Sequence, residues 1–189
     1  MELVARLCSG NPHKLEELRA ALPGWELDLL GAEAYPPEEG STHYENARGK
    51  ARFGRSVGGR EYWMLGEDSG LEVDALGGGP GLHSARWAGD EDPVDRLLQE
   101  LDQIPERRAR YVCELVAISP EGAEFRGTGT LEGRIAEERR GSEGFGYDPV
   151  FVPDAEERSV AELGNAWKAE NSHRARAARA LAAEVQLSP

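Results

Sequence analysis

Leu-Val-Ala-Arg-Leu-Cys-Ser-Gly-Asn-Pro-His-Lys, residues 3–14, joins an apolar stretch to a turn of small residues and then to helix-favouring sequence. The part from Leu3 to Cys8 is expected to form a buried strand. Ser9 to Pro12 then predicts a turn and a helix cap, with Pro12 in the first helical turn. Leucines follow at helical spacing up to Leu22, where Pro23-Gly24 is expected to end the helix. The beginning of the chain therefore predicts a strand–turn–helix unit.

The same kinds of pattern continue along the rest of the chain. Apolar stretches predict strands at residues 25–30, 62–66, 71–76, 110–118 and 124–135, the last two as a hairpin around Pro120-Glu121-Gly122. Helices are expected at residues 42–57, 93–101 and 173–185. Asp68-Ser69-Gly70 is expected to be a turn, and Gly77 to Gly81 a tight loop. This order predicts a mixed α/β fold. The length of 189 residues suits one domain, or two closely joined lobes, and we expect a single domain over residues 1–189.

The charge balance limits what the surface can bind. The formal net charge is -13, so general binding of nucleic acid is not expected. Such a surface also repels a polyphosphate at long range. A phosphate site would therefore need a local concentration of lysine, arginine, backbone N–H groups and metal.

Nothing in the sequence predicts a membrane or an oxidising environment. No apolar run approaches the roughly 20 residues that span a bilayer, and the first residues do not resemble a signal peptide. No membrane partner is expected, and the cytoplasm is the default location. Cys8 and Cys113 lie in separate apolar stretches, which favours two small buried side chains over a zinc site or a nucleophile.

The first candidate for chemistry is Ser9, Gly10, Asn11, Pro12, His13 and Lys14. A helix N-terminus offers N–H groups and a positive dipole end to phosphate, and Lys14 could reach the same anion. An ordinary capped helix with an exposed lysine explains the stretch equally, and taken alone that interpretation is favoured, because no established phosphate-loop motif is present.

Carboxylates form the second candidate. Glu45 would project from a helix, and Glu67-Asp68 directly follows an apolar strand. Mg²⁺ prefers carboxylate oxygens and completes its shell with water and substrate phosphates. A further carboxylate could take a proton from an attacking water. The alternative is that these are ordinary solvated acids, since 35 of 189 residues are acidic.

Two later stretches could recognise a base. In Gly144 to Pro149, glycines let the backbone approach a ligand and an aromatic face can stack a base; a turn with a core aromatic is the alternative. Lys168 and Ser172-His173-Arg174 form the other stretch. An ammonium donates and never accepts, so Lys168 could favour a purine carbonyl at position 6 over an amino group; a surface lysine is favoured from these residues alone. Arg86 could meet phosphate, a carboxylate or another subunit.

The order of these stretches resembles the inosine triphosphate pyrophosphatase family, which acts on non-standard purine nucleoside triphosphates. The resemblance covers nearly the whole chain. Its motifs are Ser-Gly-Asn-x-x-Lys at Ser9 to Lys14, Glu-Asn-Ala at Glu45 to Ala47, Glu-Asp-Ser-Gly at Glu67 to Gly70, Gly-Gly-x-Pro-Gly-x-x-Ser-Ala-Arg at Gly77 to Arg86, Gly-Phe-Gly-Tyr-Asp-Pro at Gly144 to Pro149, and Ser-His-Arg at Ser172 to Arg174.

The resemblance implies an elongated central sheet with flanking helices, two lobes around a cleft, homodimers, Mg²⁺, and hydrolysis to a nucleoside monophosphate and pyrophosphate. It implies that Ser9 to Lys14 hold the triphosphate. Asp68 would be proton acceptor and metal ligand, Glu45 a second metal ligand, and Ser69 a substrate contact. The base would be bound by Phe145, Gly146, Tyr147 and Asp148 and read by Lys168, His173 and Arg174. Glu67 stands where the family commonly has aspartate and is given no role.

The expected reaction is attack of water on the α-phosphorus with pyrophosphate leaving. Two alternatives stay open. A Maf-like nucleotide pyrophosphatase would prefer other nucleotides, and the Ser-His-Arg and Gly-Phe-Gly-Tyr-Asp stretches argue against it. A catalytically silent nucleotide-binding protein would bind without turnover, and intact Asp68 and Glu45 argue against that.

Overall fold

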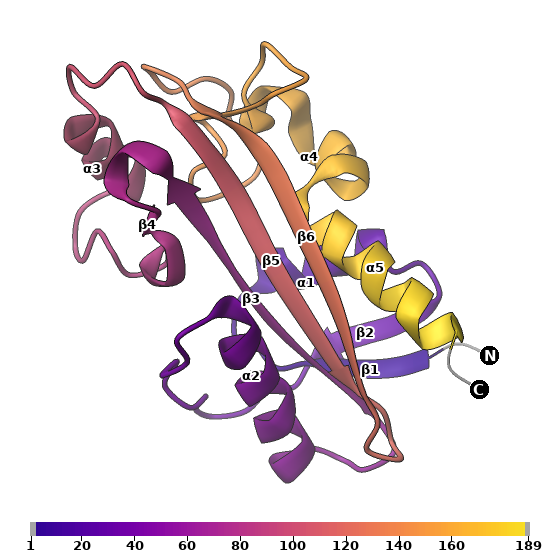
Figure 1. Cartoon of the computed structure of the whole chain (residues 1–189). Coiled ribbons are helices and arrows are strands. Elements are labelled where there is room, and N and C mark those ends of the chain that lie inside the picture. Colours follow the sequence, from indigo (N-terminus) through magenta and orange to yellow (C-terminus); the bar gives the residue numbers. More distant parts are fainter. Residues whose placement is uncertain (1–2, 188–189) are drawn as a thin grey trace. The chain divides into compact units, whose positions relative to one another are not determined.

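The computed structural model describes residues 3–187, which form α-helices and a mixed sheet (Figure 1). The strands are β1 (Leu3–Leu7), β2 (Trp25–Leu29), β3 (Trp63–Val73), β4 (Gly79–Pro80), β5 (Arg108–Ile118), β6 (Glu124–Ile135) and β7 (Phe151–Pro153). The α-helices are α1 (Pro12–Ala21), α2 (His43–Val57), α3 (Pro93–Glu100), α4 (Val160–Asn171) and α5 (His173–Leu187), with short 3₁₀ turns η1 (Asp74–Leu76) and η2 (Gly81–His83).

The strands of the described range form one seven-stranded sheet in the order β2-β1-β3-β5-β6-β7, with β4 paired to β3. β1 is parallel to both β2 and β3, and Leu7 pairs with Leu65 of β3. β6 and β7 are antiparallel. The register of β1 and β3 is important for the site, because it sets the turn after β1 beside the middle of β3. The Cys8 N–H donates to the Leu65 carbonyl at 2.7 Å and continues that pairing.

The contacts divide the chain into two compact units. The first comprises the chain up to Asp68, Cys113–Gly129 and the chain from His173 onward; the second comprises Ser69–Val112 and Thr130–Ser172. β3, β5 and β6 contribute residues to both units. Each unit has its own apolar core, and the two are described separately.

In the first unit, β5 shows how the two faces of the sheet are covered. Cys113, Leu115 and Ala117 share a core with leucines of α1 and with small residues of α5. Val116 and Ile118 instead pack with Ala47 and Ala51 of α2. Since successive strand residues point to opposite faces, α1 and α5 cover one face and α2 covers the other.

Two glycines let these helices approach the strands closely. A Cβ on Gly66 of β3 would lie 1.9 Å from the Ala47 carbonyl oxygen of α2, and one on Gly129 of β6 would lie 2.1 Å from the His173 carbonyl oxygen of α5. No other residue type fits such contacts without movement of the backbone. The close approach at Gly66 sets α2 directly beside Glu67 and Asp68.

The core of the second unit is more aromatic. Tyr111 of β5 and Phe151 of β7 have ring centroids 4.5 Å apart, and Val94 and Leu97 of α3 belong to the same cluster. α3 begins at Asp92, whose carboxylate accepts hydrogen bonds from the Val94 and Asp95 N–H groups. This core supports the segment 144–148 through Tyr147, which is buried in it.

Most of the expected elements are confirmed within a few residues, and so is the mixed α/β fold with a central sheet and flanking helices. The expected turn at Asp68-Ser69-Gly70 is wrong: these residues lie inside β3, which unites the two strands expected on either side. Local glycine and serine favour a turn, but pairing with neighbouring strands outweighs that preference. β7 and α4 were not expected from the sequence, and neither was β4, which lies within the stretch expected to be a tight loop and pairs with β3. The strand expected to reach residue 76 ends at Val73, and Asp74–Leu76 form η1.

Both cysteines are buried, as expected, and burial raises the pKa of the Cys8 thiol to about 12. No helix in residues 3–187 has both the length and the apolar character needed to cross a bilayer. The single domain over residues 1–189 and the two lobes around a cleft stay predictions.

Candidate active site

The turn after β1 is closed by its own side chains. The Asn11 carboxamide oxygen accepts from the N–H groups of His13 and Lys14, at 2.9 and 3.4 Å. The Ser9 hydroxyl accepts from the Asn11 N–H at 3.1 Å. The expected cap and the position of Pro12 in the first turn are confirmed. The Asn11 side-chain oxygen thus accepts hydrogen bonds from the N–H groups at the start of α1. An anion could bind these N–H groups only by displacing the Asn11 side chain.

Lys14 extends from α1 to β3, where it meets Glu67. The Lys14 Nζ lies 2.6 Å from the Glu67 Oε2. The other oxygen of Glu67 accepts from the Arg174 Nε and Nη2 at 3.2 and 3.0 Å, and Arg174 also donates to Glu17 of α1. Glu67 and Arg174 are fully or almost fully buried. One carboxylate of β3 therefore joins α1 to α5.

The electrostatics of Glu67 follow from these partners. Burial alone would raise the pKa of the Glu67 carboxyl, but the charges of Lys14, Arg174 and Lys50 hold that pKa well below its usual value. Burial alone would lower the pKa of the Arg174 guanidinium, and the charges of Glu67 and Glu17 raise it instead. The pair is therefore ionised in spite of its burial.

The neighbouring carboxylate, Asp68, is held from α2. Its Oδ1 accepts from the Lys50 Nζ at 2.7 Å, and its Oδ2 lies 2.6 Å from the His43 Nδ1. Lys50 also contacts the Glu38 Oε1 at 2.5 Å and donates to the Glu67 carbonyl at 3.0 Å. Burial alone would lower the pKa of Lys50, but the charges of Asp68 and Glu67 raise it above its usual value. Lys50 thus forms a cationic link between Glu38 and Asp68.

This cluster does not carry an excess of positive charge. Without His43, it holds three cationic side chains (Lys14, Lys50 and Arg174) and four carboxylates (Glu17, Glu38, Glu67 and Asp68). The charges of these side chains therefore balance or leave a slight negative excess, and by themselves they give no net attraction for an anion.

Glu45 lies elsewhere. It is exposed on the first turn of α2, and its Oε2 accepts from the Ser41 N–H and hydroxyl at 2.7 and 2.6 Å. The hydrogen bonds from Ser41 lower the pKa of the Glu45 carboxyl. Thr42 caps the same helix by accepting from the Glu45 N–H at 3.1 Å. These contacts give Glu45 a role at the helix start and do not link it to Asp68.

The second unit holds a separate polar cluster around Asp148. The Asp148 Oδ2 accepts from the Lys168 Nζ at 2.6 Å and from the Phe145 N–H at 2.9 Å. Tyr111 donates its hydroxyl to Oδ1 at 3.3 Å. The Lys168 ammonium also lies 4.6 Å from the centroid of the Phe145 ring. An aromatic face, a buried ammonium and a carboxylate are therefore assembled within one segment and one helix.

Gly144 shapes this cluster. Its φ is +79°, a value that side-chain-bearing residues rarely adopt, and an added Cβ would lie 2.2 Å from the Asp148 Oδ2. α4 is kinked at Gly164, where φ is +85°, and the Glu143 carboxylate accepts from the Asn165 N–H directly after the kink. The loop is thus fastened to the helix that carries Lys168.

The sequence model of the Ham1 family matches residues 5–184, almost all of the chain. The chain belongs to the Ham1 family.

Known proteins are similar to this chain in sequence or in fold. A protein of Bdellovibrio bacteriovorus named dITP/XTP pyrophosphatase is 41% identical over 192 residues, covering 95% of this chain and 96% of its own. One of the same name from Symbiobacterium thermophilum is 46% identical over 178 residues, covering 90% and 89%. The structure of the Staphylococcus aureus Ham1 protein is 31% identical with a TM-score of 0.84, covering 97% of this chain and 98% of that one.

The structure groups many of the residues expected in this Ham1 protein. Lys14 and Arg174 meet on Glu67, and Asp68 follows it in the first unit. Phe145, Asp148 and Lys168 meet in the second unit, where Tyr147 is buried and Gly146 is exposed. Ser69 is half-buried in β3, and His173 is buried as the first residue of α5. Gly10 and His13 are exposed on the turn before and at the start of α1.

Four contributors were missed by the sequence reasoning. Glu38, His43 and Lys50 surround Asp68, and Tyr111 donates to Asp148. One signal was available for two of them: His43 and Lys50 are seven residues apart, two helical turns, beside the small residues Ala47 and Ala51 that mark the buried face of α2. Glu38 had no such signal.

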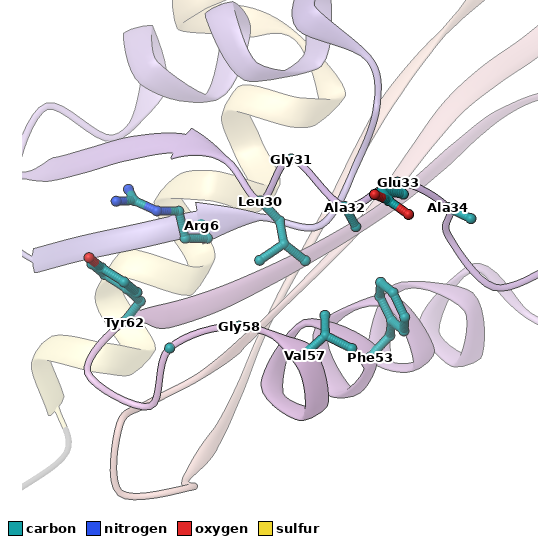
Figure 2. A pocket seen from close by; sticks show the side chains of 11 residues that line it. Arg6, Leu30, Gly31, Ala32, Glu33, Ala34, Phe53, Val57, Gly58 and Tyr62 are labelled. Carbon is teal, nitrogen blue, oxygen red and sulfur yellow. The ribbon is translucent and has the colours of Figure 1, made fainter.

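A pocket of about 570 Å³ in the first unit lies apart from these clusters (Figure 2). Figure 2 shows Phe53 and Val57 of α2 on one side and the segment after β2 on the other. The Arg6 guanidinium lies over the Tyr62 ring at 4.2 Å. The lining consists of Arg6, Leu30, Gly31, Ala32, Glu33, Ala34, Phe53, Val57, Gly58, Gly59 and Tyr62. None of the residues expected to bind substrate lines this pocket.

Proposed function

We propose that this chain hydrolyses non-standard purine nucleoside triphosphates, namely ITP, dITP and XTP, to the nucleoside monophosphate and pyrophosphate, and so removes them from the nucleotide pool. The observation that carries the proposal is the buried Asp68 carboxylate, held by Lys50 and His43 next to the Lys14–Glu67 pair. The names of the similar proteins support the same activity.

Asp68 is the proposed proton acceptor. A carboxylate within hydrogen-bond reach of a water can take its proton as the water attacks phosphorus. Asp68 has four lone-pair sites, and the contacts to Lys50 and His43 use one on each oxygen. The remaining sites are available for a metal and for the attacking water.

The residues around Asp68 fit Mg²⁺. Glu38 and Asp68 already share one cation, the Lys50 ammonium, so two hard oxygen donors converge on one positive charge. No group of three or more His, Cys, Asp or Glu that could hold a metal exists within residues 3–187. Mg²⁺ is commonly held by one or two carboxylates together with substrate phosphates and water. The bound ion would neutralise charge on the phosphates.

We assign Asp68 and Glu38 as the carboxylates that hold Mg²⁺. Sequence reasoning favoured Glu45 as the second ligand, and that assignment stays a prediction. The contacts of Glu45 with Ser41 give it no connection to Asp68, whereas Lys50 joins Glu38 to Asp68.

The phosphates are assigned to Ser9, Gly10, Asn11, Pro12, His13 and Lys14, with Ser69 as a further substrate contact. Lys14 would exchange part of its contact with Glu67 for phosphate, which suits an ammonium on a flexible stem. The helix N–H groups would become available when phosphate replaces the Asn11 carboxamide.

The base is assigned to Phe145, Gly146, Tyr147 and Asp148, with Lys168, His173 and Arg174 as readers of the oxidised purine. Stacking on an aromatic ring such as Phe145 contributes about 1–3 kcal/mol. The Lys168 ammonium would donate to a carbonyl at position 6, and an amino group there would leave a buried donor unpaired. Arg174 is already paired with Glu67 and Glu17, so its contribution to base recognition rests on the resemblance alone.

Two further expectations accompany the proposed function. The active form is expected to be a homodimer, as the family resemblance implies. The cytoplasm, where free nucleotides are made and used, is the expected location.

The experiment that tests the function is a panel of nucleoside triphosphates with pyrophosphate release as the readout. The panel contains ITP, dITP, XTP, ATP, GTP, dTTP and UTP, each with Mg²⁺ and with EDTA. We expect release from the first three only, and only with Mg²⁺. Preference for a pyrimidine nucleotide would favour a Maf-like activity. Binding of ITP without release would favour a silent binding protein.

A further inference from the structure

His43 is the first residue of α2, directly after the Thr42 cap, and its ring is buried against Asp68. The His43 Nδ1 lies 2.6 Å from the Asp68 Oδ2, and the two side chains are 8% and 6% exposed. In its proposed role as proton acceptor the Asp68 carboxylate can only accept, so that role makes the His43 Nδ1 the donor in this contact. The contact therefore fixes both the ring and the carboxylate.

The two oxygens of Asp68 are held by two residues of the same helix. Lys50 holds Oδ1 at 2.7 Å, and His43 holds Oδ2. Rotation of an aspartate carboxylate about χ2 is soft, with broad two-fold minima. One donor would leave the plane of the carboxylate loosely defined, whereas a donor on each oxygen defines it. Lys50 also contacts Glu38, so its ammonium is shared between two carboxylates. Within the described residues, the ion-pair contact of His43 is with Asp68.

The second ring nitrogen argues against a purely structural role. The His43 Nε2 is buried and has no hydrogen-bond partner among the described residues. A buried polar atom without a partner costs about 1–3 kcal/mol. An apolar ring would fill the same space without that penalty, but it would leave the Asp68 Oδ2 without this donor. The contact with Asp68 is therefore the reason that the structure gives for a histidine at this position.

We infer that His43 is a positioning residue for the proposed hydrolysis, which holds the Asp68 carboxylate in the orientation needed to accept the proton of water. This rests on the proposed function. In this role His43 acts through Asp68 and not through the substrate.

The first test compares His43→Phe, which keeps a ring without the donor, with His43→Asn, whose amide N–H can reach roughly the place of the Nδ1–H. kcat and KM for dITP are measured with saturating Mg²⁺. We expect kcat of His43→Phe to fall about 10- to 100-fold with KM nearly unchanged, because orientation of Asp68 matters in the transition state. His43→Asn should recover most of kcat. His83→Phe, a histidine replacement in the exposed η2 turn, serves as the matched control and should resemble the parent.

Thermal unfolding separates this outcome from loss of fold. If His43→Phe unfolds cooperatively and well above the assay temperature, its fold is intact, and a low kcat then reports the lost donor to Asp68. If its kcat equals that of the parent, or if His43→Asn is as slow as His43→Phe, the positioning role is overturned.

The second test does not depend on turnover. The imidazole Nδ1–H of His43 should give a downfield proton resonance that is absent in His43→Asn and moves upfield in Asp68→Asn, because a neutral acceptor makes the weaker bond. If the chemical shift of this proton is the same in Asp68→Asn as in the parent, the inference is overturned. If the parent releases no pyrophosphate from any nucleotide, the proposed function fails, and this resonance alone then decides whether His43 holds Asp68.

Discussion

Arg174 of α5 donates through both Nε and Nη2 to one oxygen of Glu67, at 3.2 and 3.0 Å, while Lys14 of α1 takes the other oxygen at 2.6 Å. Glu67 belongs to β3, so three elements far apart in the sequence meet on one carboxylate. Removing one partner of such a buried pair is far more damaging than replacing the whole pair, because the remaining charge is left buried. Glu67 therefore fixes α1 and α5 against the sheet next to Asp68.

Glu67→Gln is expected to destabilise the protein by about 3–5 kcal/mol, measured by urea unfolding at pH 7. Asp28→Asn is the matched control: Asp28 pairs with Arg6 and Arg19 at the surface with half of its side chain exposed, so a loss of about 0–1 kcal/mol is expected. Equal losses in the two variants would contradict the role of Glu67.

The pH dependence of stability gives an independent check on the same residue. The pKa of Glu67 is depressed in the folded state, so its stabilising contribution is fully present above the ordinary glutamate pKa and is lost as pH falls through the folded value. The unfolding free energy of the parent should therefore decline on the acid side, below about pH 4.5. Glu67→Gln should show a shallower decline over that window. Parallel curves for the two proteins would show that Glu67 is not ionised in the folded state.

The sequence predicted the residues of the Glu67–Asp68 region better than their local structure. Asp68 was expected in a turn after a strand, and it lies instead in the middle of the eleven-residue β3. Gly66 is needed for packing between elements and not for a turn, since a side chain there would collide with the backbone of α2. Local turn propensity cannot distinguish a glycine that bends the chain from one that admits a neighbouring helix.

The partners of Asp68 were harder to predict than Asp68 itself. Lys50 and His43 are polar residues beside the buried face of an amphipathic helix, where surface exposure is the ordinary expectation. Their contacts with Asp68 form only because β3 packs against α2 in the folded chain, and local sequence patterns do not reveal this packing. Phe145, Asp148 and Lys168 were all singled out from the sequence, but their mutual contacts depend on the kink of α4 at Gly164. That kink carries no unique sequence signal.

Glu38→Gln and Glu45→Gln distinguish the two candidate second ligands of Mg²⁺. Glu38→Gln should raise the Mg²⁺ concentration needed for half-maximal activity by about tenfold or more, the range found when a metal site loses a supporting group. Glu45→Gln should leave that concentration nearly unchanged and lower stability slightly through the weaker start of α2. The measurement is initial rate of pyrophosphate release from dITP against free Mg²⁺. The reverse pattern would restore Glu45 as the ligand.

Asp68→Asn should lower kcat by about 10²- to 10⁴-fold, the usual contribution of a positioned proton acceptor, while the fold persists. Asparagine keeps the shape of the side chain but accepts a proton poorly. Single-turnover rates with dITP and far-UV circular dichroism are the measurements, and Asp28→Asn again serves as control. Full retained activity in a folded Asp68→Asn protein would remove Asp68 from its role.

Gly144→Ala in the base-binding segment is compared with Gly122→Ala in the turn between β5 and β6. Both positions have positive φ, at +79° and +96°, but only at Gly144 does an added Cβ meet a group, the Asp148 carboxylate, whereas the space at Gly122 is open. Both variants should lose about 1–2 kcal/mol from backbone strain. Only Gly144→Ala should in addition raise KM for dITP, because the Asp148 carboxylate must shift and with it Lys168. Equal KM values in the two variants would show that Asp148 has no part in substrate binding.

Lys168→Met tests how the base is read. The Lys168 ammonium is buried, paired with Asp148 at 2.6 Å and close to the Phe145 ring, so its orientation is fixed before a base arrives. An amino group at position 6 of the purine would leave this donor unpaired, a penalty of about 1–3 kcal/mol, or roughly 5- to 150-fold. Methionine is similar in length and has no donor, so the ratio of kcat/KM for ITP to that for ATP should fall by about that factor. Lys50→Met is no suitable control because it removes a partner of Asp68; Arg86→Met, a cation replacement at an exposed turn residue, provides the comparison and should keep the ratio. A parent-like ratio in Lys168→Met, with the variant folded, would mean that the carbonyl is recognised by another group.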